Sequence, residues 1–448
     1  MNRIFLLLAV LALAITSAAP AQAAGMGVIR DEEIEQSLRA FSTPVFVQAG
    51  LSPSAVRFIL VDRNDLNAFV AGGQNIFLFT GLLLKTTGPD EVTGVVAHET
   101  GHIAHGDLIR IKTEMSNLSF QMMAATLLGI AVAAGTGKGD AGIAVASAAG
   151  TVGERTLLRH SRMQETAADQ AGVSYLLAAQ LPVTGMLSFM EKLADQELLP
   201  ESQQSEYVRT HPLTQDRVSY LQGAAEQAAK RRYNVPAEWN EMHRRMIAKL
   251  KGFIFPDQAM LDKGDSVAAR YGRAIALYRK GSVDAALKIL DPLLKEEPKN
   301  PYFYELKGQM LFEHGRIEES IPAYAKAAGF APHSGLIRAA YGHALMESRV
   351  DPKKRLDEAA SQFQLALRSE PQDSQSHHFL GIVYGKQGNE GMSRLHLAEE
   401  QLLKGQNDFA IREAKLAQAA LPKSSPGFLR ASDILEAARR SKKDKKGD

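Results

Sequence analysis

The chain has 448 residues, more than one ordinary hydrophobic core accommodates and enough for two or more domains. Hydrophobic residues make up 45% and charged residues 23%, which is the balance of a globular protein. The formal net charge of +2 gives no electrostatic reason to expect nucleic acid as a partner. The absence of cysteine excludes disulfides and a cysteine-linked lipid anchor.

Residues 1–23 are predicted to be a signal peptide that is not part of the fold. Arg3 supplies a short positive region, the apolar run IFLLLAVLALAI follows, and Ala21-Gln22-Ala23 offers a small-x-small cleavage site. A transmembrane helix would need about 20 apolar residues, so a cleaved signal is the better interpretation. The expected location is therefore the bacterial periplasm, or otherwise outside the cytoplasm, where core burial or a metal must hold a fold without disulfides.

Residues 54–84 are expected to form strands. AVRFILVD alternates and is rich in branched residues, and NIFLFTGLLL follows the turn signal AGGQN. The next segment, PDEVTGVVAHETGHIAHGDLIRIKTEM, is expected to be one helix. Its start carries Pro89-Asp90-Glu91, and apolar residues recur along it at helical spacing.

That helix contains the pattern H-E-x-x-H at His98-Glu99-Thr100-Gly101-His102. Residues four apart lie on one helix face, so His98 and His102 can share one tetrahedral Zn²⁺. Glu99 is then placed to act as a general base in metal-assisted peptide hydrolysis. Gly101 is expected to leave room for a neighbouring strand. The bare pattern also occurs by chance, so the prediction needs a third ligand.

Residues 115–137 lie between Glu114 and Lys138 and contain no charged side chain. The segment is long enough to span a bilayer, but Ala and Gly dominate it and polar residues break its first half. A helix and mobile loop beside the active site is the first interpretation. An amphipathic flap in peripheral contact with a membrane is the second, and a true span the third.

A second helix is predicted at RMQETAADQAGVSYLLAA, and helical signal continues through GMLSFMEKLADQ. Glu165 and Asp169 lie four apart on it, so both carboxylates share one face. Glu165 is the candidate third metal ligand, and Asp169 is the candidate partner that orients a ligand imidazole. Without the upstream motif, the same spacing would be interpreted as a solvated helix face.

The character of the chain changes after residue 250, where KGFIFPDQAMLDKGDS resembles a linker. Three phrases beyond it align: ELKGQMLFEHG, AAYGHALMESR and FLGIVYGKQG. Their glycines, Gly308, Gly342 and Gly381, are 34 and 39 residues apart. Three prolines keep the same spacing: Pro298, Pro332 and Pro371. A period of 34 resembles the tetratricopeptide repeat. The five-residue excess falls at SRVDPKKRLDE and is expected in an inter-helix loop. ARYGRAIALYRKG and DFAIREAKLAQAALP are further, imperfect copies.

HETGH followed downstream by SRMQETAAD resembles the gluzincin peptidases related to HtpX and the CAAX prenyl protease. With an exported signal and a repeat tail, the layout is similar to the β-barrel assembly-enhancing branch of that family. The resemblance implies His98, His102 and Glu165 as ligands of one Zn²⁺ per chain, with Glu99 as the catalytic base. The two-His, one-carboxylate set alone would also suit iron.

Two further segments take their roles from this resemblance. VRTHPLTQDRVSYL resembles the family's His-Pro segment followed by Arg, which implies His211 as a fourth, regulatory ligand and Arg217 as a supporting charge. From the residues alone, an isolated His-Pro is a loop histidine before a helix. Asn67-Ala68-Phe69 would belong to an edge strand that binds extended substrate beside the cleft. The alternative is an ordinary core hairpin.

The predicted fold class is α+β and mainly helical. A zincin-type metalloprotease domain with a small β-sheet is expected at 24–255, a linker at 256–264, and an all-α tetratricopeptide-repeat solenoid at 265–440. A disordered basic tail is expected at 441–448.

The predicted function is a periplasmic zinc metalloendopeptidase that degrades misfolded or misassembled outer-membrane proteins. Its repeat domain would bind clients and the outer-membrane β-barrel assembly machinery. The alternative is a chaperone or adaptor for outer-membrane protein assembly, with a latent zinc site that the chain itself inhibits.

Overall fold

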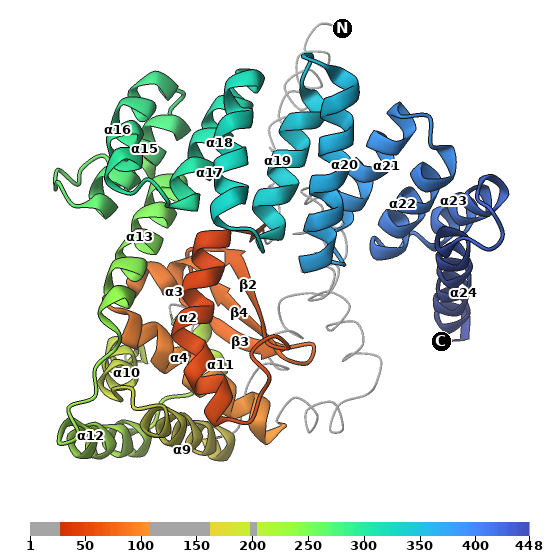
Figure 1. Cartoon of the computed structure of the whole chain (residues 1–448). Helices are drawn as coiled ribbons and strands as arrows, with labels where there is room; N and C mark the ends of the chain where they lie inside the picture. The colour runs from red at the N-terminus through yellow and green to blue at the C-terminus, as the bar shows by residue number, and fades with distance from the viewer. Residues whose placement is uncertain (1–26, 107–161, 198–203, 448) are drawn as a thin grey trace, which may run out of the picture.

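The structure is a computed structural model that describes residues 27–106, 162–197 and 204–447. A four-stranded sheet with helices around it lies beneath an arc of paired helices (Figure 1). The predicted fold class, mainly helical with a small sheet and a following helical solenoid, is confirmed. The predicted signal peptide and the segment 115–137 lie outside the described residues. Within the described ranges, no helix combines the length and apolar character that crossing a membrane requires.

The sheet consists of β1 (Gly27–Ile29), β2 (Arg57–Asp62), β3 (Ala68–Ala71) and β4 (Asn75–Phe79), in the order β1-β2-β4-β3. β2 and β4 are parallel, and β1 and β3 pair antiparallel with their neighbours. β3 and β4 are buried along their whole length, as their branched and aromatic residues predict. The AGGQN turn joins them, with positive φ at Gly72 and Gly73. Because β3 stands last in the strand order, it is an edge strand.

Two element ends differ from the sequence prediction. The NIFLFTGLLL strand stops at Phe79, and Thr80–Lys85 forms helix α3. A short apolar run fits a strand or a helix equally well, and here the helix buries Leu82 and Leu83. Likewise, α4 (Pro89–His105) does not continue through the predicted segment, because Gly106 adopts the left-handed conformation that ends a helix.

The helices around the sheet are α2 (Glu32–Gln48), α4, α9 (Arg162–Ala178), α10 (Thr184–Glu197) and α12 (Gln215–Ala229). α4 is central among them, since it packs against α2, α9 and α10. The short helix α11 (Glu206–Thr210) precedes α12. One core joins these elements and includes Phe41 and Trp239, the single tryptophan of the chain.

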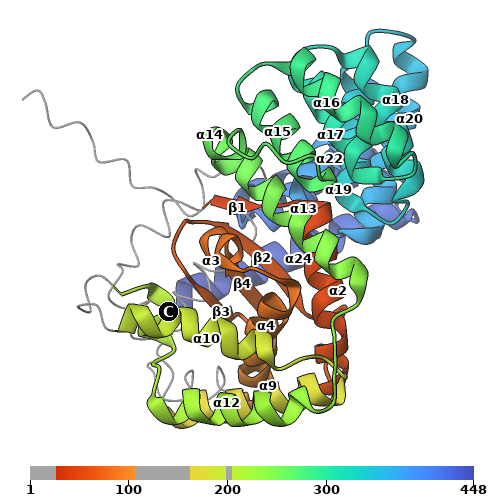
Figure 2. The same cartoon turned by 90° about the vertical axis from the view of Figure 1, so that its left-hand side faces the viewer.

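α13 (Ala237–Ile254) connects the sheet-containing part to the repeats, because it packs against both α2 and α15 (Val267–Arg279), the first repeat helix (Figure 2). The region predicted as a linker begins with the one-turn helix α14 (Pro256–Ala259). The connection is thus more helical than its composition suggested.

Five helix pairs form the repeats: α15 (Val267–Arg279), α16 (Val283–Glu296), α17 (Pro301–Glu313), α18 (Ile317–Phe330), α19 (Gly335–Glu347), α20 (Pro352–Ser369), α21 (Ser374–Lys386), α22 (Glu390–Leu403), α23 (Asn407–Ala420) and α24 (Pro426–Gly447). The aligned glycines lie where helices of a pair approach. A Cβ at Gly308 would lie 2.8 Å from the Tyr324 ring, and one at Gly342 would lie 3.0 Å from the Phe363 ring.

The repeat region differs from prediction at two places. The five-residue excess is mostly not in a loop, because α20 has 18 residues where α18 has 14. The extra residues therefore add one helical turn, for which Pro352 provides a favourable first residue. In addition, α24 continues through Gly447, so 441–447 is helical where a disordered tail was predicted.

Buried charges join the repeats to the N-terminal end of α2. Lys249 on α13 lies 2.8 Å from a carboxylate oxygen of Asp31 and 3.2 Å from one of Glu33. The Tyr271 hydroxyl donates to Glu33 at 2.9 Å, and the Ser334 hydroxyl donates to Glu32 at 2.7 Å. Because α2 also packs on α4, these contacts link the repeats mechanically to the helix that carries H-E-x-x-H.

Candidate metal centre

α4 presents His98, Glu99 and His102 from one buried helix. Pro89 suits the first turn of the helix, where its missing N–H is not needed, and the negative charges of Asp90 and Glu91 suit the positive end of the helix dipole. The Nε2 atoms of His98 and His102 lie 3.2 Å apart, as predicted for residues one turn apart. Both residues are at most 2% exposed, so the pair lies inside the protein.

α9 crosses α4 closely and brings Glu165 to these histidines. Glu165 Oε1 lies 3.3 Å from His102 Nε2, and Oε2 lies 3.4 Å from His98 Nε2. A Cβ on Gly101 would lie 2.8 Å from the backbone of Ala168 on α9. Gly101 was expected to clear space for a strand, and that expectation was wrong: it admits a helix, the one that carries the carboxylate.

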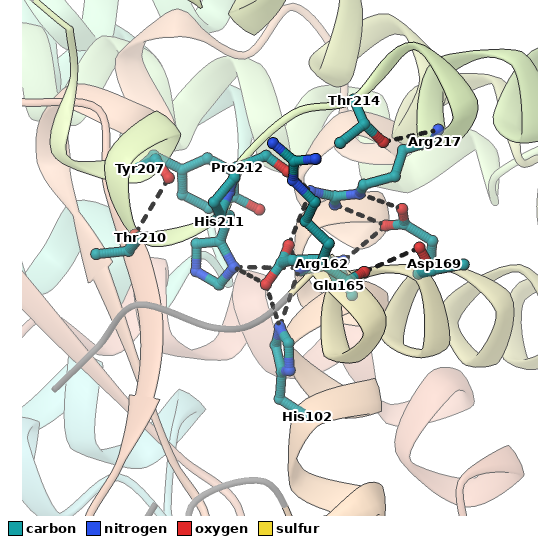
Figure 3. Close-up of polar contacts among 12 residues, drawn as sticks. His102, Arg162, Glu165, Asp169, Tyr207, Thr210, His211, Pro212, Thr214 and Arg217 are labelled. Atoms are coloured by element: carbon teal, nitrogen blue, oxygen red, sulfur yellow. Dashed lines mark hydrogen bonds and ion pairs between the residues drawn. The ribbon is translucent and has the colours of Figure 1, made fainter. Parts of the chain in front are cut away.

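Asp169 contacts His98 and Arg217 contacts Glu165, and these contacts orient the two side chains. Asp169 Oδ1 lies 2.9 Å from His98 Nδ1, which turns Nε2 toward the cluster. Arg217 donates to both Asp169 oxygens at 2.6 and 3.0 Å and lies 2.8 Å from Glu165 Oε2 (Figure 3). Burial disfavours the charged form of Asp169, but the bonds from His98 and Arg217 hold its pKa below the ordinary value.

His211 follows α11 and enters the same cluster. Its Nδ1 lies 3.0 Å from Glu165 Oε1 and 3.3 Å from His98 Nε2. Its Nε2 lies 3.3 Å from the carbonyl oxygen of Ala68 and 3.6 Å from Glu99 Oε1. A proton on Nε2 would satisfy the Ala68 carbonyl and leave the lone pair of Nδ1 directed at the cluster.

The four side chains fit a metal ion. One ligand atom from each of His98, His102, Glu165 and His211 lies within 4.8 Å of all the others, and all four residues are buried. Imidazole and carboxylate donors of this kind suit Zn²⁺. Neither carboxylate oxygen of Glu99 has a hydrogen-bond partner among the described residues, although the side chain is 0% exposed.

The charge of the cluster points the same way. Glu99, Glu165 and Asp169 bring three negative charges, and Arg217 brings one positive charge, so a divalent cation would balance the buried set. Burial alone would lower the pKa of His98, but the charges of Glu165 and Asp169 raise it to about 10. Strong attraction for positive charge at this position is what a cation site requires.

The residues predicted to bind substrate are at the edge of the sheet. Asn67 and Ala68 are buried, and Phe69 stacks on Phe77 of β4 with ring centroids 4.7 Å apart. The side chains of Ala68 and Phe69 therefore belong to the core. What this region offers the cluster is its backbone, through the Ala68 carbonyl.

Tyr207 was not singled out from the sequence, although it lies at the cluster. Its ring stacks on His211 with centroids 4.5 Å apart, and it is 3% exposed. The available signal was an aromatic residue four positions before the histidine of His-Pro, which places the two on adjacent turns of a helix.

Comparison with known proteins agrees with this geometry. Residues 29–225 match peptidase family M48, and residues 271–335 match the tetratricopeptide repeat. The chain is 27% identical over 292 residues to a β-barrel assembly-enhancing protease of Yersinia pestis, and 24% identical over 301 residues to that of Escherichia coli K12. These matches cover 62% and 66% of this chain, and the chain spans 58% and 61% of the length of those relatives.

A shorter match extends the relationship. The chain is 31% identical over 150 residues to the protease HtpX of Pseudomonas entomophila, which covers 31% of this chain and 46% of that protein. The family resemblance predicted from HETGH and SRMQETAAD is thereby confirmed.

Proposed function

We propose that this chain, which carries a peptidase family M48 domain and tetratricopeptide repeats, is a zinc-dependent metalloendopeptidase of the periplasm. The observation that carries the proposal is the buried set His98, His102 and Glu165 beside the carboxylate of Glu99, whose oxygens have no hydrogen-bond partner among the described residues. Two imidazoles, one ligating carboxylate and a second carboxylate nearby are the parts that metal-assisted peptide hydrolysis needs.

His98, His102 and Glu165 would hold the ion, and Asp169 would fix the tautomer of His98 so that Nε2 faces inward. Zn²⁺ bound there would polarise the scissile carbonyl and lower the pKa of the attacking water. Glu99 would take a proton from that water and deliver it to the leaving amine nitrogen as the C–N bond breaks. Arg217 would keep Glu165 and Asp169 in place through its paired bonds.

We infer that the clients are unfolded or misassembled proteins, with outer-membrane proteins as the expected class. The support is that the relatives from Yersinia and Escherichia are named β-barrel assembly-enhancing proteases. Helical repeats provide extended surfaces for protein binding, so the repeat region would recruit clients and the β-barrel assembly machinery.

The second candidate is a chaperone or adaptor whose metal site is latent. The observation that favours it is His211, whose Nδ1 lies among the ligand atoms and would close the fourth position. The two activities are compatible, because departure of His211 would convert a closed site into the open one that hydrolysis requires.

The test measures metal content and degradation of an unfolded model protein with and without chelator. Wild type, Glu99→Gln and the exposed control Glu191→Gln should each bind one zinc per chain, and only Glu99→Gln should lose cleavage. Carefully purified protein without metal would contradict the proposal. Metal in all three without cleavage in any would favour the latent binder.

His211→Ala separates the two candidates further. It should raise basal cleavage by opening the fourth position, whereas the exposed control His333→Ala should leave the rate unchanged. An unchanged or lower rate in correctly folded His211→Ala would remove the regulatory role.

A further inference from the structure

The segment that carries His211 lies along the edge strand of the sheet. The backbone N–H of Tyr207 donates to the Leu66 carbonyl at 3.1 Å, and His211 Nε2 lies 3.3 Å from the Ala68 carbonyl. We call Ser205–Pro212 the covering segment. It therefore contacts the edge at two positions that are two residues apart.

These two carbonyls are the ones that an added strand would use. The carbonyl of Asn67, between them, accepts from the N–H of Phe79 on β4 at 3.0 Å and so faces into the sheet. Carbonyls alternate in direction along an extended chain, so those of Leu66 and Ala68 face outward. Since β3 is an edge strand, the covering segment occupies the acceptors through which an extended peptide could pair.

Tyr207 anchors the covering segment beside the candidate metal centre, because its side chain is buried in the hydrophobic core around the sheet. Its ring packs edge-on against Phe189 of α10, with centroids 5.8 Å apart and planes at 88°. The same ring stacks on His211, with centroids 4.5 Å apart (Figure 3).

We propose that the pocket filled by Tyr207 is a substrate side-chain subsite, and that the enzyme prefers polypeptides with a tyrosine or phenylalanine at that position. The inference rests on the proposed function. An extended client that pairs with Leu66 and Ala68 takes the place of the covering segment, and its side chain enters the space that Tyr207 leaves. Phe189 then packs edge-on against the incoming aromatic ring.

Cleavage mapping tests the preference. His211→Ala protein with zinc digests an unfolded casein, and mass spectrometry locates the cut sites. Tyrosine and phenylalanine should be enriched about tenfold over alanine at one fixed position relative to the cut bond. Phe189→Leu in the same background should reduce that enrichment, whereas Phe330→Ala, an exposed aromatic of the repeats, should leave it intact. Cleavage without any aromatic preference would overturn the proposal.

Peptide binding tests the same pocket without catalysis. The probe is the synthetic peptide SEYVRTHPL, a copy of residues 205–213. Its affinity is measured for a triple variant of the full chain that carries Glu99→Gln, Tyr207→Ala and His211→Ala. Replacing the probe's tyrosine by phenylalanine should preserve binding, and replacing it by alanine should weaken binding about 10- to 100-fold, as loss of a buried ring predicts. Equal affinity of all three probes would refute the subsite. Absence of cleavage in every zinc-loaded variant, with this binding order retained, would refute the peptidase and keep the subsite.

Discussion

Arg217→Met is the perturbation that most directly tests how the candidate metal centre is held together. The Arg217 side chain is 1% exposed, and its partners Glu165 and Asp169 are 0% exposed. It makes three contacts with those carboxylates, at 2.6, 2.8 and 3.0 Å, and donates to the Pro212 carbonyl at 2.7 Å. Methionine of similar length fills the volume but leaves the carboxylates and the carbonyl without their donor.

The expected cost is large because the charges are buried. Removing one partner of a buried ion pair destabilises a protein by about 3–5 kcal/mol, since the remaining charge loses its compensation. The matched control is Arg244→Met, whose side chain is 57% exposed beside Glu241 and whose loss should cost about 0–1 kcal/mol. A second change, Asp169→Asn, removes one of the two stranded charges, so Arg217→Met should cost about 1–2 kcal/mol less in that background.

Urea denaturation followed by tryptophan fluorescence measures these differences. Trp239 is the only tryptophan and is 6% exposed in the core around the sheet, so its emission reports on the part that holds the site. Chelator should be present throughout, because a bound divalent cation would itself offset the charge of Glu165. A loss below about 1 kcal/mol for Arg217→Met in chelator would refute the view that this guanidinium neutralises the buried carboxylates.

Three further outcomes follow from the packing and the buried charges. Gly101→Ala should lower the free energy of unfolding by about 1–3 kcal/mol and weaken zinc binding, because its Cβ would lie 2.8 Å from the Ala168 backbone. Urea denaturation and zinc titration curves that match wild type would contradict this prediction. Burial, together with His377, lowers the pKa of His396 to about 3, so the folded repeats should lose at most about 5 kcal/mol as pH falls from 6.5 toward 3. His396→Gln should flatten that loss when unfolding is followed by far-UV circular dichroism. Burial raises the pKa of Glu305 from 4.5 to about 8, so the free energy of unfolding should fall as pH rises through that interval. The free energy of unfolding of Glu305→Gln should stay constant over the same interval. If it falls in parallel with wild type, Glu305 is not the group responsible.

The sequence predicted the parts of the site that depend on helix periodicity. His98 and His102 on one turn, and Glu165 and Asp169 on another, need only the 3.6-residue repeat to share a face. Their meeting across two helices depends on close approach at Gly101 and Ala168, which spacing within one helix cannot reveal. Accordingly, the sequence named residues that the structure brings together, but the neighbour of Gly101 was predicted wrongly.

The fold was hardest to predict where local preference is ambiguous. The apolar run after Phe79 fits a strand and a helix equally. In α3, Gly81 lies against the preceding loop so closely that a Cβ there would be 2.2 Å from the Asn64 carbonyl oxygen, a tertiary contact that local sequence does not reveal. In the repeats, the excess residues were located correctly along the sequence. Their helical conformation was not predicted, because the first turn of α20 is exposed at Pro352, Lys353 and Lys354 and carries no apolar periodicity.

The covering segment would also select which proteins are cleaved. On this proposal, a client that opens the centre would have to offer a backbone donor to Leu66, another to Ala68, and a ring to replace that of Tyr207. A folded protein keeps its backbone donors paired internally, so only an extended, unfolded stretch can supply all three at once. Because the covering segment is part of the same chain, its effective concentration is high, and a client held only at the edge would compete poorly. Recruitment of clients by the repeats would raise their local concentration in the same way. Self-inhibition and preference for unfolded chains would then be two consequences of one contact.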